Sequence, residues 1–169
     1  YPYRYFAPVN TGVPSGLDLD GNGTVGGNGR ERGDDAWGYG LHAGQYGMLV
    51  LSRYPIDPAQ VRTFQHLKWS AMPDASQPVD PRARRMFHSD AVWRALRLSS
   101  KSHWDVPVST PHGVLHFLVS HPTPPVFDGP EDRNGARNGD ELRLWREYLD
   151  NDPADAVWLC DDGGRCGGL

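Results

Sequence analysis

The sequence lacks any apolar run close to the roughly 20 residues that a membrane-spanning helix requires. No signal-peptide pattern opens the chain, and its 17 Lys and Arg residues against 21 Asp and Glu residues leave a formal charge of −4. The protein therefore has no bulk electrostatic attraction for nucleic acid or for an anionic membrane. Any phosphate contact has to come from a local group of basic side chains.

Cysteine is also scarce, because Cys160 and Cys166 are the only two in the chain. They flank the loop of CDDGGRC, which can close a small disulfide in an oxidising compartment. Two unpaired thiols are the alternative. A zinc site is the least favoured of the three interpretations, because the two cysteines have no second pair of ligands nearby.

Glycine and proline, in contrast, are abundant. The 20 Gly and 15 Pro residues form about a fifth of the chain, against a usual share of roughly an eighth, so loops must hold an unusual part of it. The 6 Trp, 7 Tyr and 5 Phe residues supply the burial that disordered segments lack. A length of 169 residues fits one domain, and no internal repeat or long linker divides it.

The hydrophobic pattern predicts strands and helices in mixed order. Strands are expected at residues 48–51, 61–69, 104–108, 113–121 and 156–160. Two helices are expected, one over residues 90–98 capped by Ser89, and one over residues 142–149 that starts at a capping-box-like pair, Asn138 and Glu141. This order is typical of an α+β layered domain.

The segment DLDGNGTVGGNG opens like a calcium-binding loop. Asp18, Asp20 and Asn22 place oxygen side chains at alternating positions, followed by a glycine. Gly29 stands where an EF-hand needs a bidentate Glu, and no helices flank the segment, so an EF-hand is excluded. A calcium site completed by Asp34 or Asp35 stays open beside the favoured interpretation, a plain turn of Asp, Asn and Gly.

Basic side chains lie near the ends of two predicted strands. Lys101 and His103 come with several hydroxyls just ahead of the strand at 104–108, and together these groups can neutralise and hydrogen-bond a phosphoryl oxygen. His121 follows an apolar strand and precedes three prolines, which should end the strand and expose the histidine at the rim of the sheet. There it could bind phosphate or steer a water. An exposed polar turn and a histidine bonded to the loop backbone are the respective alternatives.

Several segments together resemble, in the same order, bacterial exported proteins of the endonuclease/exonuclease/phosphatase family. They are GQYGMLVLSRYPI, LRLSSKSHWDVPV, HFLVSHPTPPVFDGPEDRNGARNGDELRLW and DDGGRCGGL, and SHPTPPVFDGPEDRN is the most specific part. The resemblance implies an α+β fold, a DNase I-like four-layer α/β/β/α sandwich of two mostly antiparallel sheets that is incomplete in this chain. It also implies hydrolysis of phosphoester bonds with a divalent cation, usually Mg²⁺.

The same resemblance implies roles for individual residues. His121 matches the family's histidine that contacts the scissile phosphate at the end of a central strand. Lys101 and His103 match the segment ahead of a neighbouring strand and are expected to bind substrate, as are Asn134 and Asn138 of the charged segment after the prolines.

The resemblance also implies what this chain lacks. The family's first-strand Asn and metal-binding Glu are expected before Tyr1, and its Gly-Asp-x-Asn segment and closing Asp-His pair after Leu169. Gly139 stands where close relatives are expected to carry a histidine. We therefore expect residues 1–169 to be one domain truncated at both ends, and inactive alone although the whole protein is a hydrolase.

Two other interpretations stay open beside the enzyme. One is a non-catalytic exported module that binds Ca²⁺ through its Asp-rich loops and a partner through its sheet, and the other is a degenerate family member that keeps only the scaffold. The resemblance implies a secreted or periplasmic protein. A monomer is expected, although the oligomeric state is undetermined. The substrate class is undetermined among nucleic acids, phospholipid head groups, sugar phosphates and inositol phosphates. The acidic charge balance disfavours tight sequence-independent binding of long nucleic acid.

Overall fold

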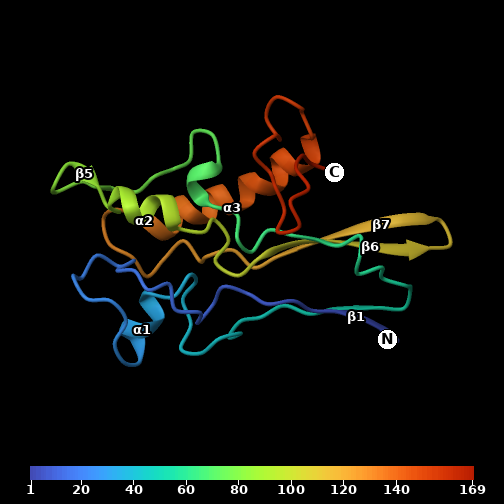
Figure 1. Ribbon diagram of the computed structural model, residues 1–169, viewed down its shortest axis with the longest axis horizontal. Helices are drawn as coiled ribbons and strands as arrows, with labels where there is room; N and C mark the ends of the chain where they lie inside the picture. Colours follow the sequence, from blue (N-terminus) through green and yellow to red (C-terminus); the bar gives the residue numbers. More distant parts are fainter.

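The computed structural model describes residues 1–169, and it has a mixed α/β arrangement with three small antiparallel sheets (Figure 1). The longest strands, β6 (His103–Thr110) and β7 (Gly113–Ser120), form a hairpin with His103 opposite Ser120. The short strand β3 (Arg62–Thr63) pairs with the other edge of β6. As the central strand of this sheet, β6 is buried over its first four residues and again at Val108.

Two further sheets contain two short strands each. Strand β1 (Tyr3–Tyr5) pairs with β2 (Val50–Ser52), and β4 (Val79–Asp80) pairs with β5 (Arg85–Met86). In Figure 1 the β1 strand lies on one side of the β6–β7 hairpin, and the two longest helices lie on the other side. The four-layer sandwich implied by the resemblance stays a prediction, whereas its mixed α/β character and antiparallel sheets are confirmed.

Helices α2 (Asp90–Ala95) and α3 (Arg133–Asp150) lie together on the side opposite β1 (Figure 1). Helix α1 (Arg30–Asp34) and the 3₁₀ turn η1 (Trp69–Ala71) are short. The predicted Ser89 cap of α2 is confirmed, because the Ser89 hydroxyl accepts a hydrogen bond from the Val92 N–H at 3.3 Å. None of the helices combines the length and the apolar character that crossing a membrane would require.

The two faces of β6 contribute to different parts of the interior. Trp104 and Val106 pack with Val9 and Val50 in a small cluster toward β1 and β2. The intervening side chains point toward α3, since Tyr148 of that helix donates to the Asp105 carboxylate at 2.5 Å. The larger cluster lies around α3 and includes residues from the turns before and after it. This alternation follows from the two-residue period of a strand.

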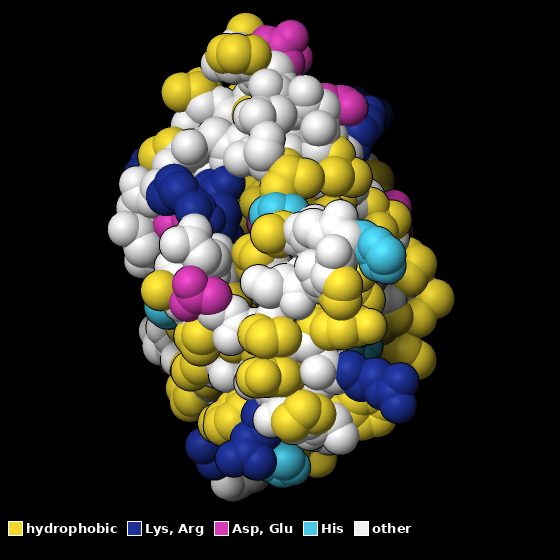
Figure 2. Space-filling view, turned by 90° about the vertical axis from the view of Figure 1, so that its right-hand side faces the viewer, with side chains coloured by type: hydrophobic (Ala, Val, Ile, Leu, Met, Phe, Trp, Pro, Cys, Tyr) yellow, Lys and Arg dark blue, Asp and Glu magenta, His cyan; other side chains and the backbone are white.

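The far end of the β6–β7 hairpin is largely exposed. Val114, Leu115 and Phe117 of β7 each have half or more of their surface accessible. Figure 2 views the molecule from this end and shows that hydrophobic side chains make up much of the face.

The prediction that the second long helix starts at Asn138 is wrong. Helix α3 begins at Arg133 after Asp132, whose φ of 50° marks the left-handed region, and Asn138 lies inside the helix. Gly135 and Gly139 weaken the helical signal in its first turns, since each costs about 1 kcal/mol relative to Ala. Long-range hydrogen bonds from this part of the helix compensate for that cost.

The prediction of a strand at residues 156–160 is also wrong. This segment consists of turns and a single bridge between Cys160 and Cys166, and Ala156 and Leu159 reach the core without any strand. The two cysteines form the disulfide that their spacing allowed. Of the strand predicted at 61–69, only β3 is formed, because the chain turns toward η1 after Thr63.

Candidate functional site

A cavity of about 440 Å³ lies between α1, the first turns of α3 and the rim where β6 starts and β7 ends. Its lining contains six basic side chains, namely Arg30, His88, Lys101, His121, Arg133 and Arg137. Asp34 is the only acidic residue that lines it, and this aspartate is paired with Arg30 at 3.4 Å. Such an excess of positive charge around a concave surface favours an anionic ligand.

Lys101 is the one lysine in the lining of the cavity, and only 5 % of its surface is exposed. Its Nζ donates to two uncharged oxygens, the Ser100 hydroxyl and the Pro122 carbonyl, both at 3.3 Å, and it forms no ion pair. Burial lowers the pKa of Lys101, the charge of Glu141 opposes that shift, and Arg137 adds to it. A buried charge without an ionic partner is costly, so an anion in the cavity would be stabilised here.

His121 lies at the rim, directly after β7 ends at Ser120, as the following prolines predicted. Its ring meets the Tyr46 ring edge to face, with the centroids 6.3 Å apart. Burial and the neighbouring Lys101 lower the pKa of His121, so the neutral imidazole is favoured at neutral pH. A hydrogen bond with the Tyr46 backbone and the charge of Glu141 oppose this shift of the pKa. A neutral ring has one N–H donor and one acceptor.

Thr123 is a polar residue of the cavity that sequence reasoning missed, because it stands inside a proline-rich run with no pattern of its own. It is buried, lines the cavity, and its hydroxyl has no hydrogen-bond partner. An unsatisfied buried hydroxyl costs on the order of 1–3 kcal/mol, which a ligand oxygen could recover.

Glu141 holds the two walls of the cavity together. One carboxylate oxygen accepts from the Ser100 N–H at 2.7 Å and from its hydroxyl at 3.0 Å, and the other accepts from the Thr123 N–H at 2.6 Å. The α3 helix is thereby tied both to the start of β6 and to the exit from β7. Because both of its oxygens accept hydrogen bonds from the protein, Glu141 has a structural role. It holds in place the two segments that carry Lys101 and Thr123.

The structure places His103 apart from the cavity. It is fully buried, its Nδ1 lies 2.7 Å from the Ser99 hydroxyl, and its Nε2 lies 3.0 Å from the Glu141 carbonyl. Its ring packs on Trp145 at 5.2 Å. With both ring nitrogens bonded inside the protein, His103 fixes α3 against β6.

The two asparagines predicted to bind substrate also differ in position. Asn134 lines the cavity, although its side-chain N–H donates to the Val126 carbonyl at 2.7 Å. Asn138 is not in the lining, and its side-chain N–H donates to the Thr123 carbonyl at 2.6 Å. Asn138 therefore supports the loop that carries Thr123.

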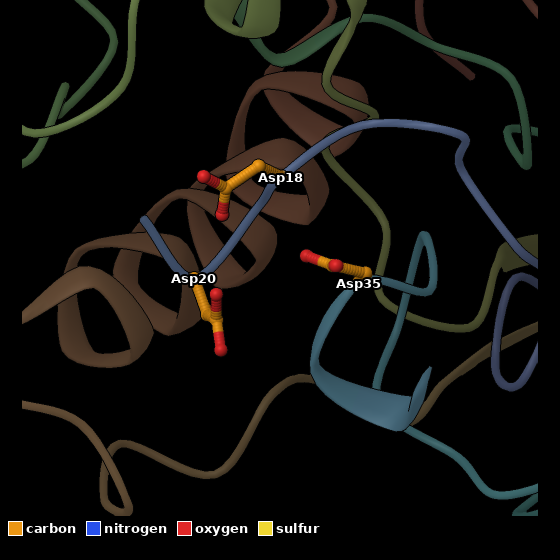
Figure 3. A group of neighbouring side chains, drawn as sticks. All are labelled: Asp18, Asp20 and Asp35. Atoms are coloured by element: carbon orange, nitrogen blue, oxygen red, sulfur yellow. The ribbon is translucent and has the colours of Figure 1, made fainter. Parts of the chain in front are cut away.

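Three aspartates form a separate acidic group, shown in Figure 3. Asp18 and Asp20 from one loop and Asp35 after α1 each bring one carboxylate oxygen within 4.8 Å of the others. Burial is the main cause that raises the pKa of Asp20, and the charges of Asp35 and Asp18 add to it. A hydrogen bond from the Asn22 backbone opposes this shift. The side chain of Asn22 lies next to this group, since it donates to Asp20 at 2.9 Å, and it accepts from the Thr24 N–H at 2.7 Å.

This acidic group fits a hard cation better than the cavity does. Carboxylate oxygens are the ligands that Ca²⁺ and Mg²⁺ prefer, whereas the cavity offers a single aspartate among six basic residues. The acidic group and the cavity are formed by neighbouring residues of the chain. The cavity lining includes Leu19, Asp34 and Ala36, each of which is next in sequence to one of the three aspartates.

Comparison with known families adds one match. The model of the endonuclease/exonuclease/phosphatase family matches residues 3–161. No curated protein and no solved structure shows a significant match.

Proposed function

The chain belongs to the endonuclease/exonuclease/phosphatase family, and on that premise we propose that it binds the phosphoryl group of a phosphoester substrate in the cavity at Lys101 and His121. The family's nuclease and phosphatase members are hydrolases, and this supports phosphoester hydrolysis as the activity that we propose. The observation that carries the proposal is a buried ammonium group, Lys101, that faces a cavity without an ionic partner.

The proposed roles follow from the chemistry of a phosphoryl group. Lys101 neutralises its negative charge, and His121 donates a hydrogen bond from the rim. Asn134 lies at the opposite wall and provides a polar contact. Preorganised donors of this kind stabilise the charge that develops on phosphoryl oxygens during hydrolysis.

Magnesium is the divalent ion that we expect in the family reaction, where it would polarise the phosphoryl group. The lining of the cavity does not fit such an ion, because its one aspartate is already paired with Arg30. We therefore propose that these 169 residues bind phosphate but do not turn over a phosphoester by themselves.

Titration calorimetry of the 169-residue chain with inorganic phosphate tests the binding. We expect binding that Lys101→Met abolishes and His121→Ala weakens about tenfold, the loss of one charge-assisted contact of roughly 1.4 kcal/mol. Lys68→Met is the matched control, because Lys68 is the only other lysine and its Nζ donates to Ala95 outside the cavity. Equal binding by all four proteins would overturn the assignment.

A hydrolysis assay tests the second part of the proposal. With bis(p-nitrophenyl) phosphate and magnesium, we expect no turnover by the chain alone. Turnover that His121→Ala removes would show that the residues present complete the reaction, and the proposed inactivity would then be wrong.

The acidic group favours a second candidate function, the binding of Ca²⁺ by Asp18, Asp20 and Asp35. Asp20→Asn removes one carboxylate charge from the group, and Asp57→Asn serves as a control outside it. We expect the first variant alone to weaken Ca²⁺ binding in calorimetry. Calcium binding that Asp20→Asn leaves unchanged would contradict this assignment.

We also propose a secreted or periplasmic location. The Cys160–Cys166 disulfide supports an oxidising compartment. Mass measurement of protein isolated from its native host without reductant checks this, because the bridge lowers the mass by about two daltons relative to the dithiol. Recovery of the fully reduced mass would argue against export.

A further inference from the structure

The cavity has room for more than one phosphoryl group. Its volume of about 440 Å³ falls in the range that small-molecule ligands occupy, and its basic residues are spread over two walls. Lys101 and His121 lie where β6 starts and β7 ends, whereas His88 precedes α2 and Arg133 and Arg137 belong to α3.

His88 is the most unusual residue of the second wall. Only 6 % of its surface is exposed, it lines the cavity, and no protein group forms a hydrogen bond with its ring nitrogens. The Phe87 ring packs edge-on against it, with the centroids 4.9 Å apart. A buried imidazole that lines a cavity without a partner is available to a ligand.

Arg133 and Arg137 lie one turn apart on the same face of α3. Arg137 donates to the carbonyls of Leu98, Trp37 and Arg97 at 2.9, 2.7 and 2.8 Å, so its charge is held in place by neutral groups alone. Arg133 is paired with Glu131 and lies over the Phe87 ring at 5.4 Å. Arg137 therefore forms no ion pair within the protein. Burial lowers the pKa of Arg137, and the charge of Glu141 only opposes that shift.

We propose that His88, Arg133 and Arg137 form a second anion subsite, which binds a further phosphoryl group of the same small ligand. This inference rests on the proposed function for the first phosphoryl group. Tyr39, Tyr46 and Phe127 also line the cavity and would pack against the organic part of the ligand. The ligand class is accordingly a small molecule that carries two separated phosphoryl groups.

Burial, with Arg137 and Arg133 as further causes, lowers the pKa of His88 to about 4. The ring is therefore neutral at pH 7 and binds as a hydrogen-bond donor, while the charge of the subsite comes from the two arginines. A neutral donor near Arg133 and Arg137 adds no further positive charge to the subsite.

The test compares two ligands that differ by one phosphoryl group, fructose 1,6-bisphosphate and fructose 6-phosphate, by titration calorimetry with the whole chain. We expect the bisphosphate to bind at least about tenfold more tightly, which corresponds to one additional charge-assisted contact. In the double variant His88→Gln/Arg133→Gln, this preference should fall to less than about twofold. Arg146→Gln is the matched control, because it removes one charge from an exposed position of α3.

Circular dichroism and thermal unfolding establish that each variant is folded. If the double variant does not fold, Arg133→Gln alone is used, since it keeps the buried His88, and the preference should still fall. A preference that survives these changes, or equal affinities in the unmodified chain, would overturn the second subsite. In that case the proposed function stands if Lys101→Met still removes binding of the monophosphate. Failure of both ligands to bind the unmodified chain would contradict the proposed function itself.

Discussion

Arg62 and Lys101 are two buried basic residues with opposite surroundings. Arg62, 4 % exposed, donates to the Asp161 carboxylate at 2.8 Å and to the carbonyls of Gly168 and Arg165 at 2.9 and 2.8 Å. Lys101 is equally buried but contacts only two neutral oxygens, and it faces a cavity. The first charge is fully compensated inside the protein, whereas the second is not.

The difference separates a structural charge from one that is available to a ligand. Arg62 holds the C-terminal loop against β3 and lies between the rings of Phe64 and Tyr148, at 5.2 and 5.1 Å. Removing one partner of such a pair leaves the other charge buried and unpaired. Lys101 forms no ion pair, although the charge of Glu141 acts on it, and under the proposed function an anion in the cavity would offset its desolvation cost.

The largest expected effect is on Arg62. We expect Arg62→Met to lower the free energy of unfolding by about 3–5 kcal/mol, because Asp161 would be left without its buried partner. Urea denaturation measures the change, and Arg165→Met, at a half-exposed position beside the same aspartate, is the control with little effect. A loss below about 1 kcal/mol would mean that Asp161 is solvated and that the contrast with Lys101 is weaker than the geometry indicates.

His88 is a third buried basic residue, and unlike Arg62 and Lys101 it is neutral at pH 7. Its folded-state pKa of about 4 lies below the usual 6.5, so the unfolded chain binds the proton first and stability falls as pH drops from 6.5 toward 4. The loss should reach about 3 kcal/mol near pH 4, and His88→Gln should remove it. Chemical denaturation across this pH range checks the prediction, with His112→Gln at the exposed β6–β7 turn as control. An unchanged pH profile in His88→Gln would contradict it.

Removing the disulfide measures how much this bridge contributes to the free energy of unfolding, beside the contacts that Arg62 makes with the same loop. Replacing both Cys160 and Cys166 by Ser should cost about 2 kcal/mol, the loop-closure entropy expected for so short a ring. The measurement is urea denaturation with and without reductant, and reductant should not change the variant. A loss close to zero would indicate that Arg62 and Asp161 already fix this loop without the bridge.

The smallest expected effect has the opposite sign. Lys101→Met should raise the free energy of unfolding in the absence of phosphate by about 1 kcal/mol, because it removes an uncompensated buried charge. Added phosphate should raise the melting temperature of the unmodified chain and leave that of the variant unchanged. A destabilisation as large as that of Arg62→Met would show that Lys101 is structural.

The features that could be predicted from the sequence depend on neighbours in the chain. The prolines after His121 end β7, Ser89 caps the helix that follows it, and Cys160 lies close enough to Cys166 to pair. Each of these outcomes is decided within a few residues, by a missing N–H donor, a capping oxygen or a short loop.

The remaining features depend on contacts between distant segments. The start of α3 follows from hydrogen bonds that Arg137 and Asn138 make with loops far away in the chain, which outweigh the glycines nearby. His103 resembles a ligand-binding residue in the sequence, yet its two ring nitrogens are bonded to Ser99 and to the Glu141 backbone. Thr123 has no local signal at all, since its place in the lining depends on where distant segments bring the chain after β7.

The carboxylate of Glu141 restricts how the cavity can change to accept other ligands. Its two oxygens bond the backbone at Ser100 and Thr123, so this side chain fixes α3 relative to the segments where β6 starts and β7 ends. Shortening or enlarging it would move α3 relative to both segments at once. We therefore expect divergence toward larger or smaller ligands to arise at the aromatic lining, at Tyr39 or Phe127, while the distance between the two walls stays constant.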